Sequence, residues 1–190
     1  MKKSTLRKFY LKKQLALSKS EWSEKSLAIK ERFFLQFNLT NVSLFHYFIT
    51  IKEKGEIDTS VIRNELRAKS FSIKTIVPRV NFDKDELEHL EYDSKTVLKT
   101  NGWGIPEPTG NNLINEDEID IVLVPMLCFD ELGFRVGHGK GFYDKFLVRC
   151  RDDCLKIGLS MFDPIGEIED VRDFDVKLDY CVTPEKVWEF

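Results

Sequence analysis

The segment that decides the fold is IDIVLVPMLCFDELGFRVGHGKGFYDKFL, residues 119–147. It begins with a predominantly apolar run, which is typical of a strand buried on both faces of a parallel sheet. A glycine-rich loop follows, in which three glycines alternate with His138 and Lys140. Alternate glycines cost backbone entropy in a regular element, so we expect unusual dihedral angles here or the close approach of a ligand. Basic side chains beside exposed amides favour an anion, such as a phosphate, as that ligand.

Two well-known phosphate-binding motifs do not match this loop. A P-loop has Ser or Thr after its lysine, whereas Gly141 follows Lys140 here. The dinucleotide-binding fingerprint requires G-x-G-x-x-G, whereas the spacing here is G-x-G-x-G. A glycine-rich structural turn between a strand and a helix is the alternative. Arg135, together with His138 and Lys140, argues against it, because basic side chains clustered around bare amides bring no structural gain.

The composition predicts one domain, residues 1–190, in a reducing compartment. The chain is 42% hydrophobic, and its formal net charge of −3 comes from acids and bases mixed along the sequence. Such a balance predicts no nucleic-acid partner. The lysine-rich start is not followed by the apolar stretch of a secretory signal, and no run approaches membrane-spanning length, so we expect a cytoplasmic protein with no membrane partner. The cysteines, expected to be buried free thiols, are Cys128, Cys150, Cys154 and Cys181.

The N-terminal half of the chain predicts helices around a first pair of strands. Apolar spacing indicates helix over residues 1–37, and the capping-box pattern of Ser18 and Glu21 predicts a break into two helices. A β-branched and aromatic run predicts a strand at 42–49. Asp58 is expected to cap the next helix. Its inward-facing residues would be Val61, Ile62 and Leu66.

The remaining elements complete an alternation of strands and helices. A strand at 73–77 is expected to end at Pro78, no element is predicted for the polar stretch 81–93, and glycines and prolines predict a loop at 101–110. Helical spacing resumes at 142–150. Late strands are expected at 155–161 and 178–184. The predicted fold class is therefore α/β, a single domain with a mainly parallel central sheet flanked by helices and an N-terminal helical segment. The glycine loop would leave the carboxyl end of a buried strand, where such sheets bind ligands.

The segment VPMLCFDELGFRVGHGKGFYDKFL, which begins at Val124, resembles the 5-formyltetrahydrofolate cyclo-ligase family. The family pattern is V-P-x-x-x-F-D-x-x-G-x-R-[LIV]-G-x-G-x-G-[FY]-Y-D, and all of its specified positions match. KSTLR near the start, PRV and WGIPEP resemble further family segments. The resemblance implies an enzyme that uses ATP as co-substrate and Mg2+ to close 5-formyltetrahydrofolate into 5,10-methenyltetrahydrofolate, with release of ADP and phosphate. It also implies small-molecule partners only and a monomer.

Two other function classes compete with this interpretation. A folate- or nucleotide-binding regulator on the same scaffold would have lost catalysis, yet binding alone would not need Arg135, Lys140 and Asp144 together. A phosphosugar isomerase would use phosphate contacts and an acid–base carboxylate but no ATP.

The resemblance implies roles for the glycine loop and for the first turn of the chain. An enzyme that transfers a phosphoryl group mainly positions its substrates and stabilises charge. Arg135 can bind two phosphate oxygens and Lys140 acts as a point charge, so both are expected to be catalytic. Lys3 and Arg7, which fall on the family's nucleotide contacts, share one face of a helix. The residues expected to bind ATP are Lys3, Ser4, Thr5, Leu6, Arg7, Arg135, Val136, Gly137, His138, Gly139, Lys140, Gly141, Phe142 and Tyr143.

The resemblance also implies a folate site. Glu56 would hold the folate through the donor edge of its pterin, and the alternative is a solvated acid in a turn. Trp103 would stack in the folate pocket, with core packing as the alternative, and Tyr143 would line this pocket or simply pack. The residues expected to bind the folate are Ile51, Glu56, Trp103, His138, Gly139, Lys140, Gly141 and Phe142.

The implied Mg2+ ligands are Asp144 and Asp175. An acid that faces nucleotide phosphates makes chemical sense with a metal between them. Asp179 lies four residues from Asp175 and is the alternative second ligand. His46 and His89 have no partners at metal-ligand spacing, and no catalytic role is assigned to a histidine.

Overall fold

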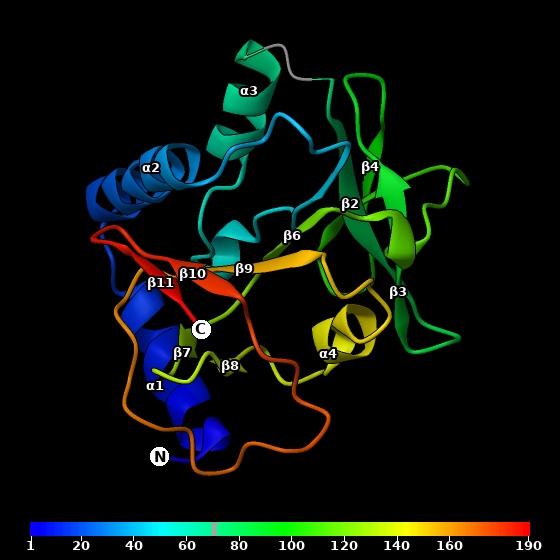
Figure 1. Cartoon of the computed structure of the whole chain (residues 1–190). Coiled ribbons are helices and arrows are strands. Elements are labelled where there is room, and N and C mark those ends of the chain that lie inside the picture. Colours follow the sequence, from blue (N-terminus) through cyan, green and yellow to red (C-terminus); the bar gives the residue numbers. More distant parts are fainter. Residues whose placement is uncertain (70–71) are drawn as a thin grey trace.

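The computed structural model describes residues 1–69 and 72–190 and has a seven-stranded sheet at its centre (Figure 1). The four inner pairings of this sheet are parallel and the two outer ones are antiparallel, which confirms the predicted mainly parallel α/β fold. In spatial order the strands are β11 (Val187–Glu189), β10 (Tyr180–Val182), β9 (Leu155–Leu159), β6 (Ile121–Val124), β1 (Leu44–His46), β2 (Lys74–Asn81) and β3 (Glu86–Glu91).

Strand β6 is the centre of the core, as its apolar sequence predicts. It pairs with β1 on one side and β9 on the other, and all four of its residues are buried. Because successive strand residues point to opposite faces, Leu123 packs with Phe33 on one side of the sheet, while Val122 packs with Phe146 on the other. Two helices, α2 (Lys19–Gln36) and α3 (Ser60–Ala68), cover the first face, and α4 (Phe142–Leu147) covers the second (Figure 1).

The first helix, α1 (Lys3–Leu15), packs on a small hairpin rather than on the main sheet. Its residues Leu6 and Tyr10 join a buried cluster with Cys128 and Val136. These come from β7 (Cys128–Phe129) and β8 (Arg135–Val136), which pair antiparallel between β6 and the glycine loop. Helix α1 therefore lies against the segment that leads into this loop (Figure 1).

Of the local signals in the N-terminal part of the chain, the capping box is confirmed. The Ser18 hydroxyl accepts a hydrogen bond from the Glu21 amide at 3.2 Å, and the Glu21 carboxylate accepts one from the Ser18 amide at 2.9 Å. This capping box separates α1 from α2, as predicted. The prediction that Asp58 caps the next helix is wrong by one residue, because Thr59 is the N-cap of α3, while Asp58 accepts from the Ser60 amide at 3.0 Å. The predicted strand at 42–49 is shorter, because only 44–46 pair with neighbours.

The prediction that the strand at 73–77 ends at Pro78 is wrong. Strand β2 continues to Asn81 and pairs through Pro78, which lies opposite His89. Because its pairing with β1 ends at Ile76, this part of β2 has one neighbour, and proline is tolerated on such a strand. The polar stretch 81–93, for which no element was predicted, contains the partner strand β3. In this strand the buried residues Leu87 and His89 alternate with glutamates, which is the period-two pattern typical of a strand.

The Gly- and Pro-rich segment 101–110 also contains a strand that was not predicted. Residues 106–108 form β5 (Pro106–Pro108), which pairs antiparallel with β4 (Leu98–Thr100) in a separate two-stranded sheet. Strand β11 was not predicted either. Two short 3-10 helices, η1 (Lys52–Lys54) and η2 (Glu116–Glu118), complete the described elements.

The cysteines are free thiols, as expected, although Cys150 is only half-buried. Among the described helices, none combines the length and the apolar character that a membrane crossing requires.

Close packing around Gly158 in β9 generates a stability prediction. A Cβ atom at this position would lie 2.1 Å from Met126 Cε and 2.7 Å from Leu178 Cδ1. Gly158→Ala is therefore expected to lower the free energy of unfolding by about 1–3 kcal/mol through overpacking. The matched control is Gly166→Ala, where a Cβ would meet nothing within 4 Å. Urea unfolding of both variants decides this, and equal stability of the two would contradict it.

Candidate active site

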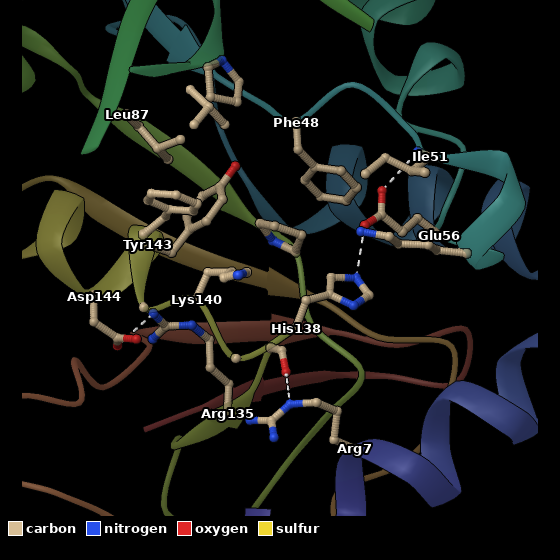
Figure 2. Close-up of a pocket in the computed structure, with 18 of the residues that line it drawn as sticks. Arg7, Phe48, Ile51, Glu56, Leu87, Arg135, His138, Lys140, Tyr143 and Asp144 are labelled. Carbon is tan, nitrogen blue, oxygen red and sulfur yellow. Dashed lines mark hydrogen bonds and ion pairs between the residues drawn. The ribbon is translucent and has the colours of Figure 1, made fainter. Parts of the chain in front are cut away.

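A cavity of about 810 Å³ opens beside the carboxyl end of β6 (Figure 2). Pro125, the residue after β6, lines it, and so does the glycine loop from Gly137 to Gly141. Other walls come from α1, from η1 and the residues around it, from β2, β3 and β5, and from the segment 170–175. The loop that the sequence marked as a ligand site thus lies at the edge of the sheet where parallel folds bind ligands.

The glycine loop has the backbone that its sequence predicts. Gly139 has a φ angle of 93° and Gly141 one of 71°, and both values belong to the left-handed region that favours glycine. Helix α4 begins immediately after Gly141. Arg7 of α1 donates from Nε to the Gly137 carbonyl at 2.9 Å, and a Cβ on Gly139 would lie 3.0 Å from Arg7 Cζ. Gly139 therefore allows Arg7 of α1 to approach the loop closely, and no backbone hydrogen bond from the amides of residues 137–141 occurs among the described residues.

Arg135 forms a buried ion pair with Asp144 across the loop. The Nη2···Oδ1 distance is 2.7 Å, and the Arg135 side chain is 5% exposed. Burial lowers the pKa of Arg135, and the Asp144 carboxylate opposes this shift. Arg135 also donates from Nη1 to the Val176 carbonyl, and Asp144 accepts from the Val176 amide at 3.1 Å. A solvated surface charge is therefore excluded for Arg135, whereas Lys140 is exposed, with Nζ 5.3 Å from the Trp103 ring centre.

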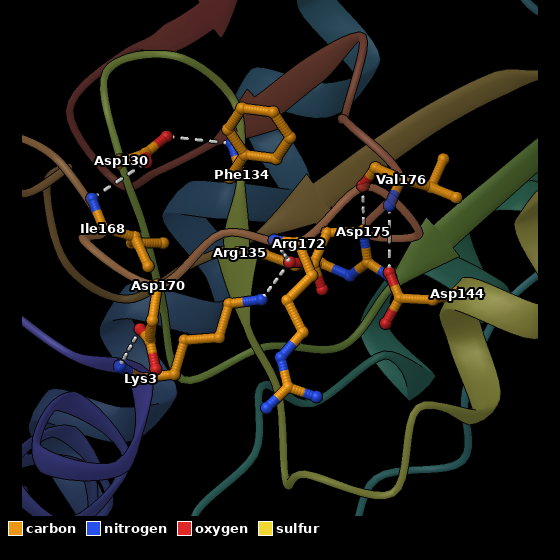
Figure 3. A network of polar contacts seen from close by, with 10 residues as sticks. All are labelled: Lys3, Asp130, Phe134, Arg135, Asp144, Ile168, Asp170, Arg172, Asp175 and Val176. Atoms are coloured by element: carbon orange, nitrogen blue, oxygen red, sulfur yellow. Dashed lines mark hydrogen bonds and ion pairs between the residues drawn. The ribbon is translucent and has the colours of Figure 1, made fainter.

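A second network joins the start of α1 to the segment 170–176 (Figure 3). Lys3 and Asp175 form an ion pair whose side chains are only 15% and 12% exposed. Asp175 also accepts from the Arg172 amide at 2.6 Å, and Asp170 accepts from the Lys3 amide at 2.6 Å. Lys3 and Arg7 therefore share the cavity-facing side of α1, as their spacing predicts.

The structure separates the two candidate aspartates near the C-terminus. Asp175 lines the cavity. Asp179 instead accepts from the Lys156 amide at 2.7 Å, between β9 and β10, and is not one of the described residues around the cavity. Asp175 is thus the acid that a ligand in the cavity can meet.

Glu56 lies on the cavity wall in a fixed orientation. Its Oε1 is 3.1 Å from His138 Nε2, and its Oε2 accepts from the Ile51 amide at 2.8 Å. Glu56 is 6% exposed, so the alternative of a solvated acid in a turn is wrong. His138, for which no partner was predicted, links this acid to the glycine loop (Figure 2).

The aromatic candidates form part of the cavity wall. Trp103 is 48% exposed and packs edge-on against Phe82 at a centroid distance of 4.7 Å, so the alternative of core packing is wrong for it. Its ring lies 6.1 Å from that of Phe142. Tyr143 does both things that were considered, because its ring packs near Phe146 while the residue lines the cavity. Its hydroxyl is buried and has no hydrogen-bond partner among the described residues.

Most of the predicted site residues lie around this one cavity. Ser4 and Ile51 line it with the residues above. Three predicted nucleotide contacts do not: Thr5 is exposed to solvent, and Leu6 and Val136 belong to the buried cluster beneath α1. Leu6 and Val136 support the site by packing beneath α1, whereas Thr5 is not among the described residues that line the cavity.

The sequence analysis missed a buried acid and a histidine pair. Glu107 of β5 lines the cavity, is 8% exposed and accepts from the Val80 amide at 2.8 Å. His46 and His89 were separated in the sequence, yet His46 Nε2 lies 3.2 Å from His89 Nδ1 in the core. Burial lowers the pKa of His89 to about 4, and it lowers that of His46 well below its ordinary value. The pair is therefore neutral at pH 7.

Comparisons with known proteins agree with this arrangement. The model of the 5-formyltetrahydrofolate cyclo-ligase family matches residues 1–184. The chain is 30% identical to the Escherichia coli 5-formyltetrahydrofolate cyclo-ligase over 141 residues, which are 72% of this chain and 76% of the relative. It is 38% identical to a probable 5-formyltetrahydrofolate cyclo-ligase of Schizosaccharomyces pombe over 112 residues, and it spans about half, 54%, of that relative.

The likeness extends to a solved structure. The NMR structure of Aquifex aeolicus 5,10-methenyltetrahydrofolate synthetase superposes with a TM-score of 0.83 at 28% sequence identity, covering 100% of this chain and 93% of the other. The family model and the fold thus agree over nearly the whole chain, which belongs to the 5-formyltetrahydrofolate cyclo-ligase family.

Proposed function

We propose that this protein is an ATP-dependent cyclo-ligase that converts 5-formyltetrahydrofolate into 5,10-methenyltetrahydrofolate. The observation that carries the proposal is a single cavity with two chemically different ends. Arg7, Arg135 and Lys140 lie together beside the glycine loop (Figure 2), and Lys3 lines the same cavity beside Asp175, which suits a polyphosphate. Phe48, Ile51 and Leu87 lie with Glu56 on the other side (Figure 2), and Glu107 also lines the cavity, which suits a ring system with N–H donors. Its volume of about 810 Å³ is within the range of small-molecule sites.

The proposed reaction begins with activation of a poor leaving group. The formyl oxygen attacks the γ-phosphorus of ATP, the bond to ADP breaks, and the formyl carbon then carries a phosphate ester. The N10 amine attacks this carbon and loses its proton, and the C–O bond breaks with release of phosphate. The product has the formyl carbon bonded to both N5 and N10. Catalysis of such a transfer is mainly positioning and electrostatic stabilisation.

The basic residues divide these tasks according to their surroundings. Arg135 is held by Asp144 and the Val176 carbonyl, so it supplies a fixed positive charge at the wall of the cavity. Lys140 is exposed on the loop, and no carboxylate lies within 4 Å of its ammonium group in the described structure. It is therefore the charge that is available to follow the transferred phosphoryl group. Arg7 holds the loop through the Gly137 carbonyl.

Asp144 and Asp175 fit a magnesium ion that arrives with its nucleotide. No group of three or more His, Cys, Asp or Glu side chains suited to a metal occurs among the described residues. Mg2+, however, needs only one or two carboxylates when substrate phosphates and water complete its octahedron. Both aspartates line the cavity, and each has one carboxylate oxygen without a hydrogen bond in the described structure. When bound, the ion would neutralise phosphate charge. A monomeric state and a cytoplasmic location stay predictions.

A spectroscopic assay tests the proposed function. With 5-formyltetrahydrofolate, ATP and Mg2+, the protein is expected to form the methenyl product, seen by its absorbance, together with one ADP per turnover. Omission of ATP is expected to abolish the signal. Folate binding without product would indicate the non-catalytic regulator instead, and absence of both folate binding and product would refute any folate function.

Lys140→Ala is expected to lower kcat by about ten- to a hundredfold, because a charge-assisted contact contributes about 1.5–3 kcal/mol. The matched control is Lys145→Ala in α4, whose ammonium pairs with Asp85 at 2.6 Å outside the cavity. Steady-state kinetics measures kcat of both variants, and their melting temperatures show whether a lower kcat results from a loss of folded protein. Near-parent turnover in Lys140→Ala, or an equal loss in the control, would contradict the role of Lys140.

Asp144→Asn is expected to raise the Mg2+ concentration for half-maximal rate severalfold or more, with little change in folate affinity. The substitution keeps the shape and removes the charge. It also removes the counterion of buried Arg135. Loss of one partner of a buried ion pair costs about 3–5 kcal/mol, so the free energy of unfolding is expected to fall by up to that amount. Asp179→Asn is the control outside the cavity. An unchanged Mg2+ titration would place the metal elsewhere, and Asp175→Asn would be tested next.

A further inference from the structure

Glu107 is a buried carboxylate whose hydrogen bonding is incomplete. It lies on β5, is 8% exposed and lines the cavity. Its Oε1 accepts from the Val80 amide at 2.8 Å, which attaches β5 to β2. Its Oε2 has no hydrogen-bond partner, and no cationic group lies within 4 Å of either oxygen in the part of the chain that the structure describes.

Glu56, Asp144 and Asp175 differ from Glu107 because each of them has a basic side chain as a partner. Both oxygens of Glu56 are occupied, one by the Ile51 amide and one by His138. Asp144 is paired with Arg135, and Asp175 with Lys3. The free oxygen of Glu107 is not among the buried unpartnered atoms of the described residues, so it is open to the cavity, and a glutamine would serve the Val80 amide equally well without a charge. The hydrogen bond from Val80, which attaches β5 to β2, therefore does not explain why this residue is an acid.

The surroundings of Glu107 define the kind of group that it can meet. Val80, which donates to Glu107, and Leu87, which lies opposite Val80 in the β2–β3 pairing, are apolar residues of the cavity wall, as is Ile105, two residues before Glu107. A carboxylate repels a triphosphate, so this end of the cavity disfavours the phosphates of a nucleotide. An N–H donor on a neutral ring suits it, because an ionised carboxylate only accepts hydrogen bonds.

We propose that Glu107 recognises the reduced folate by accepting a hydrogen bond from an N–H group of its ring system. This inference rests on the proposed function, in which a reduced folate occupies the apolar end. The folate ring has more N–H donors than Glu56 alone can serve, so a second carboxylate on another wall fixes its orientation. Glu107 is thus a recognition residue that acts on folate affinity and leaves nucleotide affinity unchanged.

Glu107→Gln tests the inference, because the amide oxygen keeps the bond from Val80 while the amide nitrogen turns a donor toward the ligand. Its Kd for 5-formyltetrahydrofolate, measured by calorimetry without ATP, is expected to rise about ten- to a hundredfold. The Kd for ATP is expected to stay that of the parent. Glu107→Asp, which keeps the charge, is expected to retain more folate affinity than Glu107→Gln. The control is Glu91→Gln on β3, an acid whose carboxylate pairs with Lys74 at 3.8 Å away from the cavity.

Three outcomes would overturn the inference: an unchanged folate Kd in Glu107→Gln, an ATP Kd that rises as much as the folate Kd, or an equal change in the control. A loss of melting temperature that accounts for the weaker binding, with Glu107→Asp no better than Glu107→Gln, would assign Glu107 to structure only. The proposed function is decided separately by methenyl formation in the parent protein. Product formation with normal folate binding in Glu107→Gln would refute this inference alone, and a parent that binds no folate would refute both.

Discussion

The Arg135–Asp144 ion pair is the interaction on which the arrangement of the site depends. Its two residues stand on either side of the glycine loop, one on β8 and the other in the first turn of α4. A loop of alternating glycines has little conformational preference of its own, so its shape must be imposed at its ends. The buried pair does this, and its bonds to both backbone groups of Val176 join the loop to the C-terminal segment. Such a pair gives position rather than stability, because desolvation offsets much of its attraction.

The distribution of charge in the cavity follows from the same arrangement. Basic side chains are held at one end by partners that also orient them, as Lys3 is by Asp175 and Arg135 by Asp144. The carboxylates of Glu56 and Glu107, by contrast, line the cavity together with apolar side chains. Preorganised charges of this kind need little reorganisation when substrates bind, and this is the form of electrostatic assistance that phosphoryl transfer requires.

The sequence predicted features that depend on residues close together in the chain, but not features that are created by contacts between distant segments. The buried strand β6 and the capping box at Ser18 depend on residues close in sequence, and both were predicted correctly. The resemblance to the family located Glu56 and Trp103, although the residues alone left their surroundings undecided. Strand β5 was read as a loop because its two prolines are breakers in isolation. It exists because the β4–β5 hairpin folds against β2. Glu107 was missed for the same reason, since its burial is created by that contact.

The Lys3–Asp175 pair has a consequence for how the enzyme matures. These residues are 172 positions apart in sequence, and they meet at the end of the cavity that suits phosphates. A nascent chain still on the ribosome, or one that has lost its last segment to proteolysis, lacks this wall and lacks Asp175, the carboxylate that pairs with Lys3. Assembly of this wall therefore waits until the chain has been made as far as Asp175 and depends on a contact between its two ends.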